Sequence, residues 1–145
     1  MLTQQEADEL MALDKRFVDA DPVEFPGPGG SLVRSLMSLD GRESFLLDVN
    51  RRGRIRLTKC TYQERYAATI ILVRLDLGGP PHTNPDGTEL PCSHLHRYRE
   101  GYEDRWAKSL PTNVFTDTSD LCATLEEFLS FCNVRDVPPI QKVLI

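Results

Sequence analysis

Apolar and polar positions alternate along the middle of the chain, in short stretches separated by turn residues. Phe45, Leu47 and Val49 alternate with Ser44, Leu46 and Asp48, a period of two that is typical of a strand with one buried face and one mainly solvent-exposed face. The stretch at 66–77 is apolar on both parities, which predicts a central strand with both faces covered. Strands of an antiparallel meander over about residues 31–110 are predicted at 32–39, 44–49, 54–61, 66–77 and 93–99.

Both ends of the chain have the spacing of amphipathic helices. Thr3 and Glu6 fit a capping box, and Leu10, Leu13 and Phe17 then recur at helical intervals, which predicts a helix over residues 3–20. A second helix is predicted over residues 118–133, with an apolar stripe formed by Leu121, Leu125, Phe128, Leu129 and Cys132.

The predicted elements add up to one domain over residues 1–145. After Pro138 and Pro139 the C-terminal tail cannot extend the helix, although residues 143–145 can form a short edge strand. We therefore predict an α+β fold, in which an N-terminal and a C-terminal helix flank a curved antiparallel sheet.

Charge and cysteine content narrow the classes of function. The 22 acidic and 17 basic residues give a formal charge of -5, which disfavours binding to duplex DNA through a broad basic face. No apolar run reaches the roughly 20 residues that cross a bilayer, and no stretch resembles a signal peptide. The four cysteines lack CxxC pairs, so we expect free thiols, a cytoplasmic location and no membrane partner.

All three histidines fall within fifteen residues, at His82, His94 and His96. Histidine exchanges protons near neutral pH and is the commonest nitrogen ligand of metals, so this segment is the candidate site. The period of a strand places His94, His96 and Tyr98 on one face, with alternate residues roughly 7 Å apart. The two imidazoles can then hold one small group between them.

One chemistry that suits this spacing is metal-independent cleavage of a phosphodiester. His94 and His96 would be the acid and base pair, and His82 and Tyr98 would orient or stabilise the reacting groups. Phosphate would be held by arginines, for which the candidates are Arg97, Arg99 and Arg74.

The second chemistry is a divalent metal site, so the cofactor stays open at this point. His94, His96 and Glu100 form His-x-His-x3-Glu, which resembles the first metal motif of the cupin barrels. Cupins also use a later histidine, which this chain lacks, and Ala107 stands where the motif has its closing glycine. His82 from the earlier loop, Asp86 or Cys92 would then complete the ligands.

A purely structural role is the third interpretation, because paired histidines on a strand can satisfy carboxylates or backbone carbonyls in a polar network. For Arg74 and Asp76 we favour a structural ion pair at the end of a strand. Asn84 and Asp86 are interpreted as turn residues that hydrogen-bond their own backbone.

The segment around the histidines also resembles a known group of proteins. Residues 74–87, which contain PPHTNPDG, and the later HLHRYREGY and Trp106-Ala107 are similar to small uncharacterised proteins of bacteriophages and prophages, and the likeness extends from about Phe25 onward. The resemblance implies an accessory role in the host cytoplasm and no particular activity. The His-x-His strand is also similar to that of some small toxins of toxin and antitoxin operons.

Two classes of function remain open. The first is a small phosphodiester-directed enzyme acting on RNA or a nucleotide through the histidines. The second is a non-catalytic acidic inhibitor, of the anti-CRISPR kind, that binds a host nucleic-acid-handling complex by presenting carboxylates in place of phosphates. Its candidate surfaces are Glu9, Asp14, Asp19, Asp21 and Glu24, or Glu100, Glu103 and Asp104.

Overall fold

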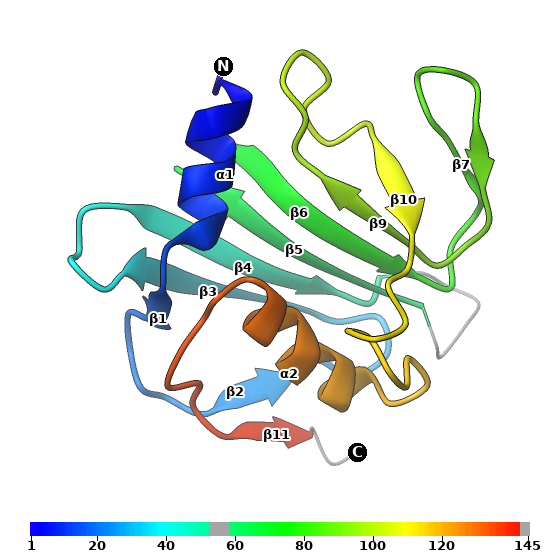
Figure 1. Ribbon diagram of the computed structural model, residues 1–145. Helices are drawn as coiled ribbons and strands as arrows, with labels where there is room; N and C mark the ends of the chain where they lie inside the picture. Colours follow the sequence, from blue (N-terminus) through cyan, green and yellow to red (C-terminus); the bar gives the residue numbers. More distant parts are fainter. Residues whose placement is uncertain (53–58, 143–145) are drawn as a thin grey trace.

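Two helices and a seven-stranded sheet dominate the computed structural model, which describes residues 1–52 and 59–142 (Figure 1). All neighbouring strands of this sheet are antiparallel, which together with the two terminal helices confirms the α+β class. In spatial order the strands are β1 (Lys15–Phe17), β3 (Ser31–Ser38), β4 (Ser44–Asn50), β5 (Cys60–Tyr66), β6 (Ile70–Leu77), β9 (His94–Arg97) and β10 (Ala107–Ser109).

Two small sheets complete the fold. Strand β2 (Val23–Phe25) pairs in parallel with β11 (Ile140–Lys142), which brings the C-terminal segment beside the N-terminal part of the chain. Strands β7 (His82–Thr83) and β8 (Glu89–Leu90) form a hairpin that follows β6. None of the helices within residues 1–52 and 59–142 has the length and apolar character needed to cross a membrane.

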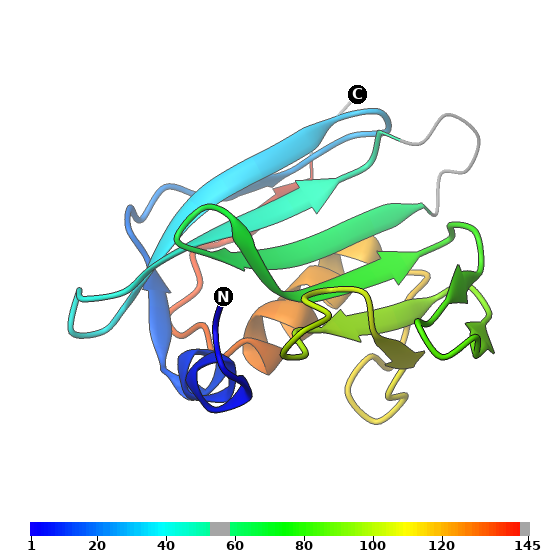
Figure 2. The ribbon, with the colours of Figure 1, turned by 90° about the horizontal axis from the view of Figure 1, so that it is seen from above.

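Helices α1 (Gln4–Ala12) and α2 (Leu121–Phe131) lie on the same face of the sheet, as Figures 1 and 2 show. The alternation predicted for β4 is confirmed, because Phe45, Leu47 and Val49 are fully buried against these helices. Leu125, Phe128 and Leu129 of α2 are equally buried, and the Tyr62 hydroxyl donates to the Leu121 carbonyl at 2.7 Å. The apolar core therefore lies between this face of the sheet and the helices.

The first helix is shorter than the predicted range of 3–20. Its capping box at Thr3 is confirmed, but the helix ends at Ala12, and Lys15–Phe17 becomes edge strand β1. The reason is tertiary: Lys15 is fully buried and its ammonium donates to the carbonyls of Met11, Leu13 and Cys132. These contacts satisfy carbonyls at the helix end and override the helical spacing of the apolar residues.

The strand predicted at 66–77 was also too long. Ala67 and Ala68 have φ values of 50° and 68°, so the chain turns there and β6 begins at Ile70. Tyr66 instead ends β5, most of which was not predicted. Most of the strand predicted at 54–61 and the tail strand at 143–145 lie outside the described residues.

The second helix is confirmed with shorter bounds than 118–133. Its N-cap is Asp120, whose carboxylate accepts from the Ala123 amide at 3.0 Å. The strand predicted at 93–99 is likewise confirmed in its first part, as β9, and all four cysteines are free thiols.

Among the described residues, no helix covers the other face of the sheet (Figures 1 and 2). That face carries polar side chains that pair with one another, such as those of Asp48 and Arg65. Strand β6 is inside the sheet, as predicted, but along its second half only one face meets the apolar core, and Arg74 and Asp76 lie on the other. One row of cross-strand neighbours on this open face runs through Asp48, Gln63, Arg74 and His96. The next row runs through Thr61, Asp76 and His94.

Candidate functional site

The pairing of β9 with β6 brings the strand histidines to the open face. His94 lies opposite Asp76 and His96 opposite Arg74, while Leu95 between them is buried in the apolar core. The two imidazole rings approach with their centroids 4.9 Å apart and nearly perpendicular. The period-two prediction that both rings share one face is therefore confirmed.

The third histidine, His82, reaches the same place from the β7–β8 hairpin. Its ring centroid lies 4.5 Å from that of His96 and 5.5 Å from that of His94. One possible ligand atom from each of the three residues lies within 4.8 Å of the others. The structure therefore joins all three predicted histidines in one cluster.

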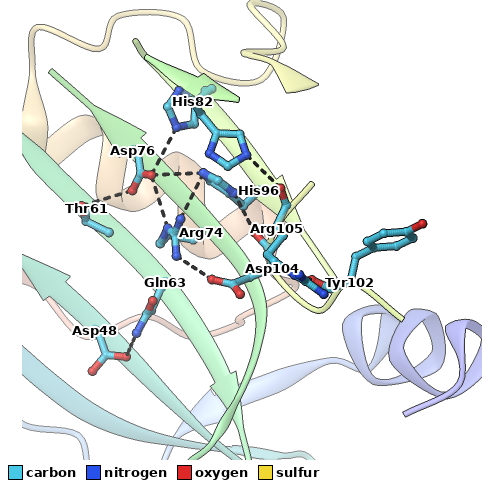
Figure 3. A network of polar contacts seen from close by, with 11 residues as sticks. Asp48, Thr61, Gln63, Arg74, Asp76, His82, His96, Tyr102, Asp104 and Arg105 are labelled. Atoms are coloured by element: carbon cyan, nitrogen blue, oxygen red, sulfur yellow. Dashed lines mark hydrogen bonds and ion pairs between the residues drawn. The ribbon is translucent and has the colours of Figure 1, made fainter. Parts of the chain in front are cut away.

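Asp76 is the centre of the polar contacts in this cluster (Figure 3). Its Oδ2 lies 3.3 Å from His94 Nε2 and 3.2 Å from His96 Nε2, and its Oδ1 accepts from the Thr61 hydroxyl at 3.2 Å. Burial alone would raise the pKa of the Asp76 carboxyl, but His96, Arg74 and His94 outweigh it and lower the pKa to about 2. Asp76 is therefore an anion at neutral pH.

Each histidine ring is held by a backbone carbonyl through one nitrogen. His96 Nδ1 lies 2.7 Å from the Asp104 carbonyl, His94 Nδ1 lies 3.1 Å from that of Pro91, and His82 Nε2 lies 2.8 Å from that of Arg105. Because a carbonyl only accepts, these three nitrogens carry hydrogen. The second nitrogen of each ring is left for the cluster itself.

Arg74 is the cation of the cluster and lies on the open face beside Asp76 (Figure 3). Its guanidinium donates to the Asp104 carboxylate at 2.6 Å and lies 3.3 Å from Asp76 Oδ2 and 3.1 Å from His96 Nε2. The predicted ion pair of Arg74 with Asp76 is thus confirmed, but Asp76 also serves both strand histidines.

A cleft of about 390 Å³ opens over these residues. His94 and His96 are almost fully buried at 3% and 0% exposure and form part of its wall, whereas His82 is half-buried. The same cleft is also lined by Lys59, Thr61, Leu77, Gly79, Pro80 and Pro81. A volume of this size is at the lower end of the range for small-molecule sites.

Four residues predicted for the site lie elsewhere. The Tyr98 hydroxyl donates to the Leu2 carbonyl at 2.6 Å, and Arg99 stacks on Trp106 with its guanidinium 4.2 Å from the ring centroid. Arg97 is exposed at the end of β9, on the side of the strand that carries Leu95 and not on the side of the histidines. Glu100 accepts from the Gln4 amide, so it does not join the histidines as the cupin motif implies. The period of two fails here because β9 ends at Arg97.

Two neighbouring residues were interpreted as turn-formers, and one interpretation was incomplete. Asp86 accepts from the Thr88 amide, as a turn residue does. The Asn84 side chain instead donates to the Ala107 carbonyl at 2.9 Å and accepts from the Ala107 amide at 2.8 Å. Asn84 therefore ties the hairpin of His82 to strand β10.

The fold and the cleft together define an α+β protein with a histidine and carboxylate cluster on the uncovered face of its sheet. The chain belongs to a family of unknown function, DUF6978, whose profile matches residues 2–134. Searches of curated proteins and of solved structures found no match.

Proposed function

We propose that the protein is a small enzyme that acts on a phosphate-bearing substrate, RNA or a nucleotide, in the cleft beside the histidines. The observation that carries the proposal is the convergence of His82, His94, His96 and Asp76 with Arg74 at one open cleft. Groups that transfer protons or activate water thus lie next to a group that binds phosphate.

Phosphate recognition is assigned to Arg74, with Lys59 as a second cation lining the cleft. A guanidinium presents paired donors that match phosphate oxygens, and one terminal nitrogen of Arg74 is fixed by Asp104. Arg97 and Arg99 have no part in this proposal, because one lies on the other parity of β9 and the other is stacked on Trp106.

The strand histidines are proposed to act jointly. Nε2 of His94 and Nε2 of His96 both face the same Asp76 oxygen, so they converge on one point. This arrangement favours the activation of a single water molecule over an acid and a base on opposite sides of the substrate. His82, the most exposed of the three, is placed to contact the substrate.

The resemblance to phage proteins supports a setting for this activity: an enzyme that works on RNA or nucleotides in the cytoplasm of an infected host. The acidic inhibitor remains a prediction, and several of its carboxylates are engaged within the protein. Asp14 pairs with Arg135, Asp19 with Arg34, and Asp104 with Arg74. We therefore favour the enzyme.

The test is an incubation of the purified protein with end-labelled RNA and with cyclic and linear nucleotides, followed by separation of the products. We expect cleavage by the wild type and at least a hundredfold loss of activity in His82→Gln, because the imidazole is removed. Glutamine is chosen because its amide can keep the hydrogen bond to the Arg105 carbonyl. Asp86→Asn, on the turn of the same hairpin, is the matched control and keeps full activity. A wild type that cleaves none of these substrates would refute the proposal.

A further inference from the structure

We infer that His82, His94, His96 and Asp76 form a binding site for one divalent metal ion of the zinc type. The inference deepens the function proposed above and rests on it for its catalytic meaning, because a bound metal lowers the pKa of a water ligand and so supplies the nucleophile. Metal binding itself can be measured without any substrate.

The spacing of the ligand atoms fits a small tetrahedral shell. Zinc bonds to nitrogen and oxygen of roughly 2.0–2.1 Å place neighbouring ligand atoms about 3.3–3.4 Å apart. Asp76 Oδ2 lies 3.3 Å from His94 Nε2 and 3.2 Å from His96 Nε2. His82 offers its ligand atom within 4.8 Å of the other two histidines. The separations of Asp76 from both strand histidines therefore already match a tetrahedral shell, and the histidine nitrogens need to approach one another only moderately.

The hydrogen bonds around the cluster are those that orient metal ligands. A histidine that binds a metal through one nitrogen typically donates its other N–H to a carbonyl or carboxylate, which fixes the tautomer. Carbonyls of Pro91, Arg105 and Asp104 take this role for His94, His82 and His96. The nitrogens left over are Nε2 of both strand histidines, next to Asp76, and Nδ1 of His82.

His96 shows why a proton alone does not satisfy the cluster. Its Nε2 lies between Asp76 Oδ2 at 3.2 Å, an acceptor, and Arg74 Nη2 at 3.1 Å, a donor. An unprotonated Nε2 accepts from Arg74 but opposes the carboxylate, and a protonated Nε2 donates to Asp76 but opposes the guanidinium. A metal between His96 and Asp76 removes the opposition between the nitrogen and the carboxylate. It occupies the Nε2 lone pair, so Arg74 Nη2 loses this acceptor while its Nη1 keeps the ion pair with Asp104.

The ligand set also indicates which metals are suitable. Three imidazoles with one carboxylate are borderline ligands, which suit zinc and its transition-metal neighbours better than magnesium or calcium. His82 is the most exposed of the three histidines and belongs to a two-stranded hairpin, so it is the ligand that water or a substrate can displace. Such an exchangeable position distinguishes a catalytic metal site from a closed structural one.

The test begins with protein freed of metal by dialysis against a chelator and then titrated with Zn²⁺ alone in a calorimeter. A parallel titration with Co²⁺ reports the coordination geometry through its visible absorption. We expect one ion per chain and a tetrahedral cobalt spectrum. Asp76→Asn and His82→Gln should each weaken binding at least tenfold. Circular dichroism of both variants checks that they are folded.

Three control variants separate this site from other metal ligands in the chain. Asp86→Asn tests a carboxylate on the same hairpin, Cys92→Ser tests the thiol closest to His94 in the sequence, and Glu100→Gln tests the cupin-type arrangement. All three should bind Zn²⁺ as the wild type does. The inference is overturned if the folded wild type binds no stoichiometric Zn²⁺, or if binding is lost in a control variant but kept in Asp76→Asn.

The outcomes also separate the inference from the proposed function. Stoichiometric Zn²⁺ binding without cleavage of any RNA or nucleotide keeps the metal site and refutes the phosphodiester activity. Cleavage by metal-free protein in the presence of chelator keeps the activity and overturns the catalytic role of the metal, whereas the Zn²⁺ titration alone decides whether the site binds metal.

Discussion

Two clusters of ionisable residues lie on opposite faces of the same sheet, and only one is open to a cleft. On the helix-covered face, Lys15 and Glu64 have side chains with 0% exposure and lie 3.4 Å apart. On the uncovered face, Asp76 and the histidines line a cleft of about 390 Å³. Both clusters remove charge from water, so burial of charge does not distinguish a functional site from a structural one.

The partners of each cluster make the distinction. The Lys15 ammonium donates to three carbonyls, from Met11, Leu13 and Cys132, and so fastens the ends of α1 and α2 to the sheet. Its hydrogen-bonding capacity is used within the protein. In the Asp76 cluster, by contrast, the carboxylate and the nitrogens of three histidines converge on one point beside a cleft. A metal ion or a substrate group can bind at that point. Access to a cleft and the convergence of possible ligand atoms on one point identify the site.

The largest expected effect concerns the covered face. Lys15→Ala leaves Glu64 buried without its counter-ion and three carbonyls without a donor, so we expect a loss of about 3–5 kcal/mol in the free energy of unfolding. Urea denaturation measures it. Asp14→Asn breaks the half-exposed pair with Arg135 and should cost less than about 1 kcal/mol. Equal effects of the two variants would remove the contrast between a buried and a surface pair.

The second prediction moves to the uncovered face. His82→Gln should lower the rate of RNA or nucleotide cleavage at least a hundredfold, which corresponds to about 2.7 kcal/mol in the activation free energy. The reason is that the variant lacks an imidazole that binds the metal and contacts the substrate. The free energy of unfolding should change by less than about 1 kcal/mol, since His82 is only half-buried and the glutamine keeps a donor for Arg105. Comparable losses in stability and rate would place His82 with Lys15 as a structural residue.

A smaller effect is expected at Arg74, which is both a phosphate ligand and a competitor of the metal. Arg74→Gln removes a positive charge beside Asp76 and His96, so Zn²⁺ binding should tighten by up to about tenfold. The KM for substrate should rise by roughly tenfold, because the phosphate loses its guanidinium partner. Calorimetry measures the Zn²⁺ affinity and steady-state kinetics measures the KM. If the variant bound both Zn²⁺ and substrate more weakly, or both more tightly, the dual role of Arg74 would be contradicted.

The smallest expected effect is a change of the free energy of unfolding with pH, caused by Glu64 on the helix-covered face. Burial raises the pKa of the Glu64 carboxyl above 4.5, although the Lys15 ammonium opposes the shift. Its native state therefore holds the proton more tightly, so its contribution to stability is full below 4.5 and is lost as the pH rises through the raised pKa. Against Glu64→Gln, the wild type should lose at most about 1.4 kcal/mol per pH unit in that window. Parallel curves for the two proteins would disprove the shift.

Local patterns predicted much of the fold. The alternation of Phe45, Leu47 and Val49 identified the buried face of β4, and the capping box at Thr3 marked the start of α1. The end of α1 was wrong because it depends on Lys15, whose partners include Cys132 from the far end of the chain. Contacts of that kind leave no local pattern in a sequence.

The site shows the same limit. The histidines were found from their unusual clustering, and the sequence spacing placed His94 and His96 on one face. The role of Asp76 depends on which strand pairs with β9 and in which register, which neither segment shows alone. The placement of Tyr98 beside the histidines was wrong because the extended strand was taken to continue past Arg97.

The loop between β9 and β10 has a further consequence for how this family can vary. The peptide oxygens of Asp104 and Arg105 select the tautomers of His96 and His82, and every residue type carries such an oxygen. Exchange of the Arg105 side chain should therefore be tolerated, whereas a one-residue insertion would misalign two imidazoles at once. Among relatives, the length of this loop should be kept more strictly than its composition.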